Sequence, residues 1–281
     1  MKRYIALGLL IIVLVLGIVF HYHQKPKVDK PIVYNGTYIA LGDSVSAGDG
    51  LQNYSDSSAC NRSNQSYPYL ISKNLNLQLH NLSCSGATLS AGLNGPQNVN
   101  RMIVTSQLDQ LNKLPKPKLI TITAGANDVG WIENIASCYK GNCGNQTETN
   151  FTNAKIANLS NSFSLTLNNI ASTYKNKLPI VVVTSYYSPF PASFTSCADM
   201  TNLDQSSLDW LNSEEIILND QLESITKNFQ FVKFVKLDYS GHELCSSNPW
   251  VQGLTENAPY HPNTDGQKYI AHRIQMTYVS N

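Results

Sequence analysis

Five short apolar, β-prone segments alternate with longer amphipathic segments along this chain, and this alternation constrains the fold more than any other feature. The predicted strands cover residues 37–41, 77–82, 118–124, 180–184 and 231–237. The predicted helices cover residues 66–75, 102–114, 151–174, 208–229 and 265–279. Strands that alternate with helices indicate βαβ units. We therefore expect an α/β fold, a three-layer α/β/α sandwich with a mostly parallel five-stranded sheet.

Small-residue turns follow the first three predicted strands, and each turn carries a polar group. Ser44 ends Gly42-Asp43-Ser44 after the first strand, Gly86 follows the second, and Asn127 follows the third. The carboxyl ends of parallel strands share one edge of the sheet, where open α/β folds bind ligands. We expect the three turns to converge there, with Asp43 and Asp128 holding loops by capping rather than taking part in chemistry.

A histidine that can join this edge lies just before the last predicted helix, in Pro259-Tyr260-His261-Pro262-Asn263. A serine with a histidine in reach is a candidate nucleophile with its general base. Attack by Ser44 on a carbonyl would create an oxyanion that needs two or three fixed donors. The expected donors are the N–H groups of Ser44 and Gly86 and the side-chain amide of Asn127.

Other histidines and two tryptophans have less context. His80, His242 and His272 are interpreted as structural or surface residues. Trp131 and Trp250 are candidates for the wall of an acyl or alcohol pocket, with core packing as the alternative.

The charge pattern excludes one class of partner. Charged residues make up 14% of the chain, the net charge is +1, and the body has no basic stripe. Nucleic acid is therefore not an expected partner.

Six cysteines lie in the body at positions 60, 84, 138, 143, 197 and 245. A zinc site is disfavoured because no C-x-x-C occurs and no histidine stands at ligand spacing. An even number of cysteines, in a chain whose N-terminus has the export-signal pattern described next, predicts three disulfides. The residues alone leave fifteen pairings open.

The N-terminus has the pattern of an export signal. Lys2 and Arg3 precede an uncharged apolar run at 5–20. Because no small-residue cleavage site follows, we favour an uncleaved membrane anchor over a cleaved signal peptide within residues 1–27. A polar linker at 28–35 then leads to one fair-sized domain at 36–281, placed outside the cell or at its surface.

These motifs resemble those of the SGNH/GDSL hydrolases, over roughly residues 36–279. Gly42-Asp43-Ser44 matches the first block, Gly86 the second and His261 the last; the third is Gly125-Ala126-Asn127-Asp128. More narrowly, the chain is similar to the secreted bacterial esterase and lipase branch with three disulfides. Features shared with that branch are Ala59-Cys60-Asn61-Arg62-Ser63, Tyr67-Pro68, Cys84-Ser85-Gly86-Ala87-Thr88, Leu244-Cys245 and Pro249-Trp250.

The resemblance implies an SGNH, flavodoxin-like fold and the pairings Cys60–Cys84, Cys138–Cys143 and Cys197–Cys245. It also implies carboxyl-ester hydrolysis through an acyl-enzyme on Ser44, with His261 as base and with no metal and no cofactor. Most of the family has an aspartate three residues before the histidine, where this chain has Ala258. The branch it resembles uses a backbone carbonyl there, so the resemblance assigns the orientation of His261 to the Ala258 carbonyl, with Glu256 and Asp265 as fallback partners.

The sequence thus predicts a monomeric serine esterase or lipase acting on small-molecule or lipid esters, reaching a membrane through its N-terminal segment if that segment is retained. The alternatives within the family are a polysaccharide O-deacetylase and a phospholipase. A non-catalytic surface-binding module on the same fold is an alternative of another class, supported by the missing aspartate.

Overall fold

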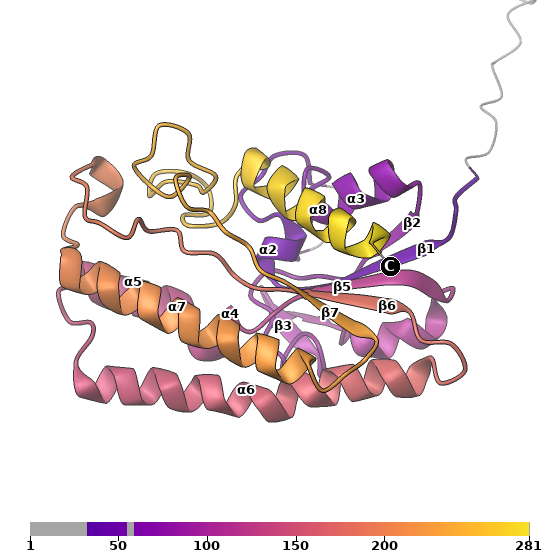
Figure 1. Ribbon diagram of the computed structural model, residues 1–281. Helices are drawn as coiled ribbons and strands as arrows, with labels where there is room; N and C mark the ends of the chain where they lie inside the picture. The colour runs from indigo at the N-terminus through magenta and orange to yellow at the C-terminus, as the bar shows by residue number, and fades with distance from the viewer. Residues whose placement is uncertain (1–32, 55–58, 281) are drawn as a thin grey trace, which may run out of the picture. The chain divides into compact units, whose positions relative to one another are not determined.

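The computed structural model describes residues 33–54 and 59–280, in which one compact unit begins at Tyr34 (Figure 1). The predicted anchor or signal peptide at 1–27 and most of the linker at 28–35 lie outside the described residues. Among the helices of the described ranges, none has the length and apolar character that crossing a membrane requires.

A five-stranded sheet forms the middle layer of this unit. Its strands are β1 (Thr37–Gly42), β2 (Gln78–Asn81), β5 (Pro117–Thr123), β6 (Ile180–Thr184) and β7 (Val232–Val235). They pair in the order β2-β1-β5-β6-β7, and every pair is parallel. The five predicted strands and the parallel sheet are confirmed. Since the chain runs from β1 to β2 on one side and returns to β5 on the other, the topological switch point lies between β1 and β5.

Helices form the two outer layers. The long ones are α3 (Tyr67–Leu75), α6 (Gln146–Thr173), α7 (Gln205–Thr226) and α8 (Thr264–Val279). Helices α3 and α8 pack together on one face of the sheet, and α6 and α7 pack together on the other (Figure 1). The central strands are therefore covered on both sides, and residues 38–41 and 181–183 have no exposed surface. This confirms the predicted three-layer sandwich.

The predicted helix at 102–114 is wrong in its first half. Met102–Val104 forms strand β4, which pairs antiparallel with β3 (Gln97–Val99). Asn100 and Arg101 join the strands with φ angles of 50° and 67°, the left-handed pair of a tight hairpin turn. Met102 and Ile103 are exposed, so these apolar side chains do not form the buried face of a helix. Only a 3₁₀ helix, η1 (Leu108–Lys113), follows.

Between the third predicted strand and the predicted helix at 151–174, the chain forms two helices that the sequence analysis does not predict. The segment contains α4 (Ala126–Val129) and α5 (Trp131–Tyr139). Ile135 and Cys138 are buried on one face of α5, four and seven residues after Trp131. Because α5 is short and lies next to cysteine and glycine residues, its helical periodicity cannot be recognised from the sequence.

Candidate active site

The turns after β1 and β5 meet at the switch point because their backbones approach closely. Gly42 pairs with Thr123 at the end of both strands, and Asp43 N–H donates to the Thr123 carbonyl at 3.0 Å. A Cβ on Gly42 would lie 2.2 Å from that carbonyl oxygen, and its φ is 132°. Only glycine fits this position. The polar groups that follow the two strands are thus brought to one place.

Ser44 begins α2 (Ser44–Ala47), a single turn capped by Asp43, whose carboxylate accepts from the Val45 N–H at 3.0 Å. Ser44 is only 9% exposed. Its Oγ lies 2.7 Å from His261 Nε2, although 217 residues separate the two along the chain. The two residues predicted as nucleophile and base are therefore in hydrogen-bond contact.

The loop before α8 carries His261 to the serine. Gln252 holds this loop through two backbone bonds, from the Tyr260 N–H to its carbonyl at 2.9 Å and from its N–H to the His261 carbonyl at 2.8 Å. Asn263 then caps α8 by accepting from the N–H groups of Asp265 and Gly266. Helix α8, which begins at the end of this loop, packs against α3.

The acceptor beside His261 Nδ1 is not the one predicted. The Pro259 carbonyl lies 3.1 Å from Nδ1, whereas the Ala258 carbonyl accepts from the backbone N–H of His261 itself. The assignment to Ala258 is therefore wrong by one residue. Its cause is the left-handed conformation of Tyr260, whose φ of 69° turns the preceding peptide toward the imidazole.

The two fallback acids have other partners. Glu256 accepts from the Gly253 N–H at 2.7 Å. Asp265 lies in the first turn of α8, as expected from the helix dipole, and contacts Lys268 at 2.8 Å.

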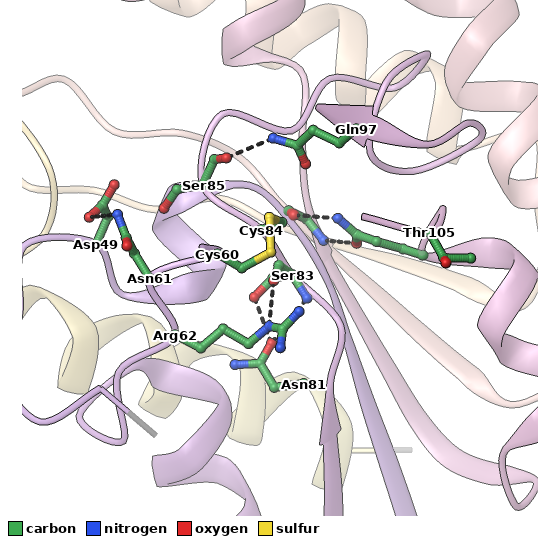
Figure 2. The surroundings of a disulfide bond; sticks show 12 residues. Asp49, Cys60, Asn61, Arg62, Asn81, Ser83, Cys84, Ser85, Gln97 and Thr105 are labelled. Atoms are coloured by element: carbon green, nitrogen blue, oxygen red, sulfur yellow. Dashed lines mark hydrogen bonds between the residues drawn. A yellow bond between two sulfur atoms is a disulfide. The ribbon is translucent and has the colours of Figure 1, made fainter. Parts of the chain in front are cut away.

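Two contacts hold the chain just before Gly86, at Cys84 and at Ser85 (Figure 2). The Cys60–Cys84 disulfide fixes the chain two residues before the glycine. The Gln97 side chain donates to the Ser85 carbonyl at 2.8 Å. Gly86 has a φ of 75°, and a Cβ there would meet no atom closer than 3.6 Å, so backbone conformation rather than space favours glycine.

Asn127 reaches from the end of β5 toward this second turn. Its Nδ2 donates to the Ala87 carbonyl at 2.9 Å. An amide nitrogen carries two hydrogens, so one more can be donated. Asp128 strengthens the same link, since its two carboxylate oxygens accept from the Leu89 N–H at 3.0 and 3.1 Å. Burial raises the pKa of Asp128 to about 6, against the effect of that N–H.

Asp43 is the most deeply buried acid of the site. Burial raises its pKa to about 7, and the hydrogen bonds from the Tyr186 hydroxyl and the Val45 N–H oppose that rise. Asp43 and Asp128 therefore both act on backbone or loop geometry, in agreement with the prediction that they hold loops.

A cavity of about 50 Å³ opens beside Ser44 and His261. Its wall includes Trp131, Ile132 and Pro189 and is mainly apolar. Trp131 thus lies where the sequence analysis suggested. Trp250 instead stacks on His242, with ring centroids 3.6 Å apart. His80 lies in β2 and His272 is an exposed residue of α8, so these three histidines have structural or surface positions.

All three disulfides implied by the resemblance are present, namely Cys60–Cys84, Cys138–Cys143 and Cys197–Cys245.

Sequence reasoning missed several residues that support the site. Gln107 exchanges two hydrogen bonds with the backbone of Gly42, at 2.8 and 2.9 Å. Tyr186 and Tyr187, which follow β6 after Ser185, reach the turn of Ser44 and the loop of His261. The place of these tyrosines after the fourth predicted strand is a signal that could have identified them, because that strand ends at the same edge of the sheet as the others.

Comparison with known proteins places the chain in a family. Residues 40–269 match the model of the GDSL-like Lipase/Acylhydrolase family. A lipase from Streptomyces rimosus is 29% identical over 262 residues, which cover 88% of this chain and 88% of that protein. Lipase 1 of Streptomyces coelicolor is 28% identical over 279 residues, which cover 95% of this chain and 96% of the relative.

Solved structures agree with these sequence matches. The crystal structure of an extracellular lipase from Streptomyces rimosus is similar with a TM-score of 0.63 and 28% identity, covering 86% of this chain and 99% of that one. Phospholipase A1 from Streptomyces albidoflavus NA297 shares the fold with a TM-score of 0.65 and 24% identity, covering 87% and 99%. Because the family model spans most of the chain, and because its blocks fall on turns that meet at one sheet edge, this chain belongs to the GDSL-like lipase/acylhydrolase family and is a hydrolase of the SGNH fold.

Proposed function

We propose that the chain hydrolyses carboxylic esters through an acyl-enzyme on Ser44, with His261 as the general base. The observation that carries the proposal is the 2.7 Å contact between Ser44 Oγ and His261 Nε2 beside an apolar cavity. The lipases to which the chain is similar support the same reaction class. This hydrolysis can proceed with the Ser44 and His261 side chains, the oxyanion donors and water.

The first half-reaction transfers the acyl group to the enzyme. Ser44 Oγ attacks the ester carbonyl carbon while His261 Nε2 takes the hydroxyl proton. The negative oxygen of the tetrahedral intermediate accepts from the N–H groups of Ser44 and Gly86 and from the side-chain amide of Asn127. The intermediate then expels the alkoxide, which receives the proton from His261 and leaves as the alcohol.

In the second half-reaction a water molecule replaces the alcohol. His261 takes a proton from the water, the hydroxide attacks the acyl carbon, and Ser44 recovers the proton as the acid leaves. The Pro259 carbonyl, 3.1 Å from Nδ1, fixes the tautomer and the ring orientation that both steps require. A neutral carbonyl stabilises the imidazolium less than a carboxylate does, so this histidine works without the usual acidic partner.

The proposal is tested by initial hydrolysis rates on p-nitrophenyl esters from acetate to palmitate, using the full chain with its disulfides intact. The Ser44→Ala variant is the blank. We expect wild-type turnover and a loss of at least ~10³-fold in the variant. The chain-length profile of the wild type then separates an esterase from a lipase.

Other outcomes would select an alternative. Cleavage of acetate alone would favour a polysaccharide O-deacetylase, and release of fatty acid from phospholipid vesicles would favour a phospholipase. Wild-type and Ser44→Ala rates that are both at background would sink ester hydrolysis and leave a non-catalytic surface-binding module.

Export is part of the proposal. Three disulfides form in oxidising compartments, and one structural relative is an extracellular lipase. We propose that the compact unit works outside the cell or at its surface as a monomer, delivered by the N-terminal segment as an anchor or as a signal peptide. Immunoblots of washed cells and culture medium distinguish the two forms of delivery.

A further inference from the structure

Two consecutive tyrosines after β6 have roles that the dyad and the oxyanion donors do not explain. Tyr186 and Tyr187 are both buried, and both border the cavity beside Ser44. Neighbouring residues of an extended segment point to opposite sides. Their hydroxyl groups accordingly reach different parts of the site, and each forms hydrogen bonds with protein atoms.

The Tyr186 hydroxyl joins the nucleophile turn to the oxyanion loop. It donates to the Asp43 carboxylate, whose other oxygen accepts from the Val45 N–H at 3.0 Å. It also accepts from the Ala126 N–H at 3.1 Å, one residue before Asn127. One oxygen atom therefore fixes the spacing between Ser44 and an oxyanion donor.

The main chain of Tyr186 is itself held firmly. The Asn219 side chain on α7 accepts from the Tyr186 N–H at 2.8 Å and donates to the Tyr186 carbonyl at 3.2 Å. The Ser185 hydroxyl donates to the same carbonyl at 2.6 Å. The tyrosine is thus anchored to the helical layer before it reaches across to the site.

The Tyr187 hydroxyl holds the other half of the site. It donates to the Tyr260 carbonyl at 3.1 Å, and its ring stacks on Tyr239 with centroids 4.1 Å apart. Tyr260 has a φ of 69°, which is costly for a bulky residue and persists only where neighbours enforce it. This conformation directs the Pro259 carbonyl at His261 Nδ1, so a hydroxyl that holds the turn acts on the base.

We propose that Tyr186 and Tyr187 are positioning residues for the ester hydrolysis proposed above: Tyr186 sets the oxyanion loop against the nucleophile, and Tyr187 sets the histidine loop against both. The inference rests on that proposed function. Burial raises the pKa of each phenol well above its usual value, so both remain protonated donors wherever the enzyme works.

The test measures kcat and KM for p-nitrophenyl butyrate with full-length wild type, Tyr186→Phe and Tyr187→Phe. Tyr38→Phe is the matched control, because its buried hydroxyl contacts the Thr121 hydroxyl at 2.7 Å inside the sheet. Thermal midpoints of all four proteins measure the structural cost of losing a buried hydroxyl. Neither site hydroxyl is directed at substrate, so we expect kcat to fall about tenfold to a hundredfold with KM nearly unchanged. The control should lose stability without losing kcat.

A second variant covers the case in which Tyr186→Phe does not fold. Asn219→Ala keeps the phenol and releases its main chain, and it should lower kcat with KM unchanged. If the wild type turns over and the kcat values of Tyr186→Phe and Tyr187→Phe match that of Tyr38→Phe, the positioning role of the two tyrosines is overturned and the proposed function stands. A wild type with no turnover above that of Ser44→Ala would overturn both the proposed reaction and the positioning role.

Discussion

The two halves of the active edge are built in different ways. Ser44, Gly86 and Asn127 follow the ends of adjacent parallel strands, and β1 and β5 stay in register up to Gly42 and Thr123. His261 instead lies in a long loop after β7, whose only strand-like contact among the described residues is the bridge between Val251 and Pro262. The first half is therefore set by sheet topology, and the second depends on side chains that reach it from elsewhere.

This difference explains where each half is vulnerable. The turns at the strand ends begin from hydrogen bonds of the sheet itself, to which side chains such as Gln107 and Tyr186 add further contacts. The loop that carries His261 depends on Gln252, Tyr187 and a left-handed Tyr260. A substitution at one of these residues can therefore displace the His261 imidazole. The predictions below compare the two halves, from the largest expected effect to the smallest.

Removing the base should have the largest effect. We expect His261→Ala to lower kcat for p-nitrophenyl butyrate by at least ~10³-fold, because nothing else takes the Ser44 proton. His242→Ala is the matched control, since that ring stacks on Trp250 and should leave kcat unchanged. A loss of less than tenfold in His261→Ala would show that another group serves as base.

Removing one oxyanion donor should cost less than removing the base. We expect Asn127→Ala to lower kcat about 10²-fold, the usual cost of one such donor, with a small change in KM. Exposed Asn142→Ala provides the control. An effect on KM alone would mean that Asn127 binds substrate in its ground state and does not stabilise the oxyanion.

The disulfides compare the halves through stability. Cys60–Cys84 closes 24 residues beside Gly86, and Cys197–Cys245 closes 48 residues and ends in the histidine loop. Loop entropy gives a loss of about 3 kcal/mol for the first and about 4 kcal/mol for the second when both cysteines become alanine. Chemical denaturation measures both losses. The first pair should also lower kcat of the folded protein, and an unchanged kcat would show that the turn of Gly86 is held by Gln97 alone.

The last comparison concerns pH and Asp43, where each pH unit should change the unfolding free energy by less than the loss of either disulfide. Its folded pKa of about 7 lies above the ordinary value of 3.8, so the folded state holds a proton that the unfolded state releases. This contribution is fully present below pH ~4 and is lost as pH rises to ~7, with a slope of at most about 1.4 kcal/mol per pH unit. Asp43→Asn removes the titration. The unfolding free energy of the variant minus that of wild type should therefore increase as pH rises over this range, whatever constant difference the substitution itself causes. Parallel pH profiles of the two proteins would contradict the raised pKa of Asp43.

The sequence predicted which strand-end turns meet at one edge of the sheet. Apolar runs that end in Gly42, Cys84 and Ala124 are local signals, and parallel topology carries the turns after them to one edge. Helix α5 and the hairpin of β3 and β4 were missed because their patterns are shorter than the window in which helical spacing can be recognised.

The acceptor of His261 could not be predicted for a different reason. Whether the carbonyl of Ala258 or that of Pro259 faces Nδ1 depends on one backbone angle at Tyr260, and that angle is enforced by Gln252 and Tyr187. Neither is a neighbour in the sequence. The Tyr186 hydroxyl was hidden in the same way, since its partners are 60 and 143 residues away.

The left-handed Tyr260 also restricts how this protein can change by mutation. Glycine and asparagine adopt a φ of 69° at little cost, whereas valine, isoleucine and threonine are strongly disfavoured there. Its ring contributes separately, because it packs near Phe190 and Tyr139, with centroids 5.6 and 6.3 Å away. Position 260 must therefore meet two demands that few residue types satisfy together, and in a saturation library it should tolerate far fewer substitutions than its half-buried place on the cavity wall implies.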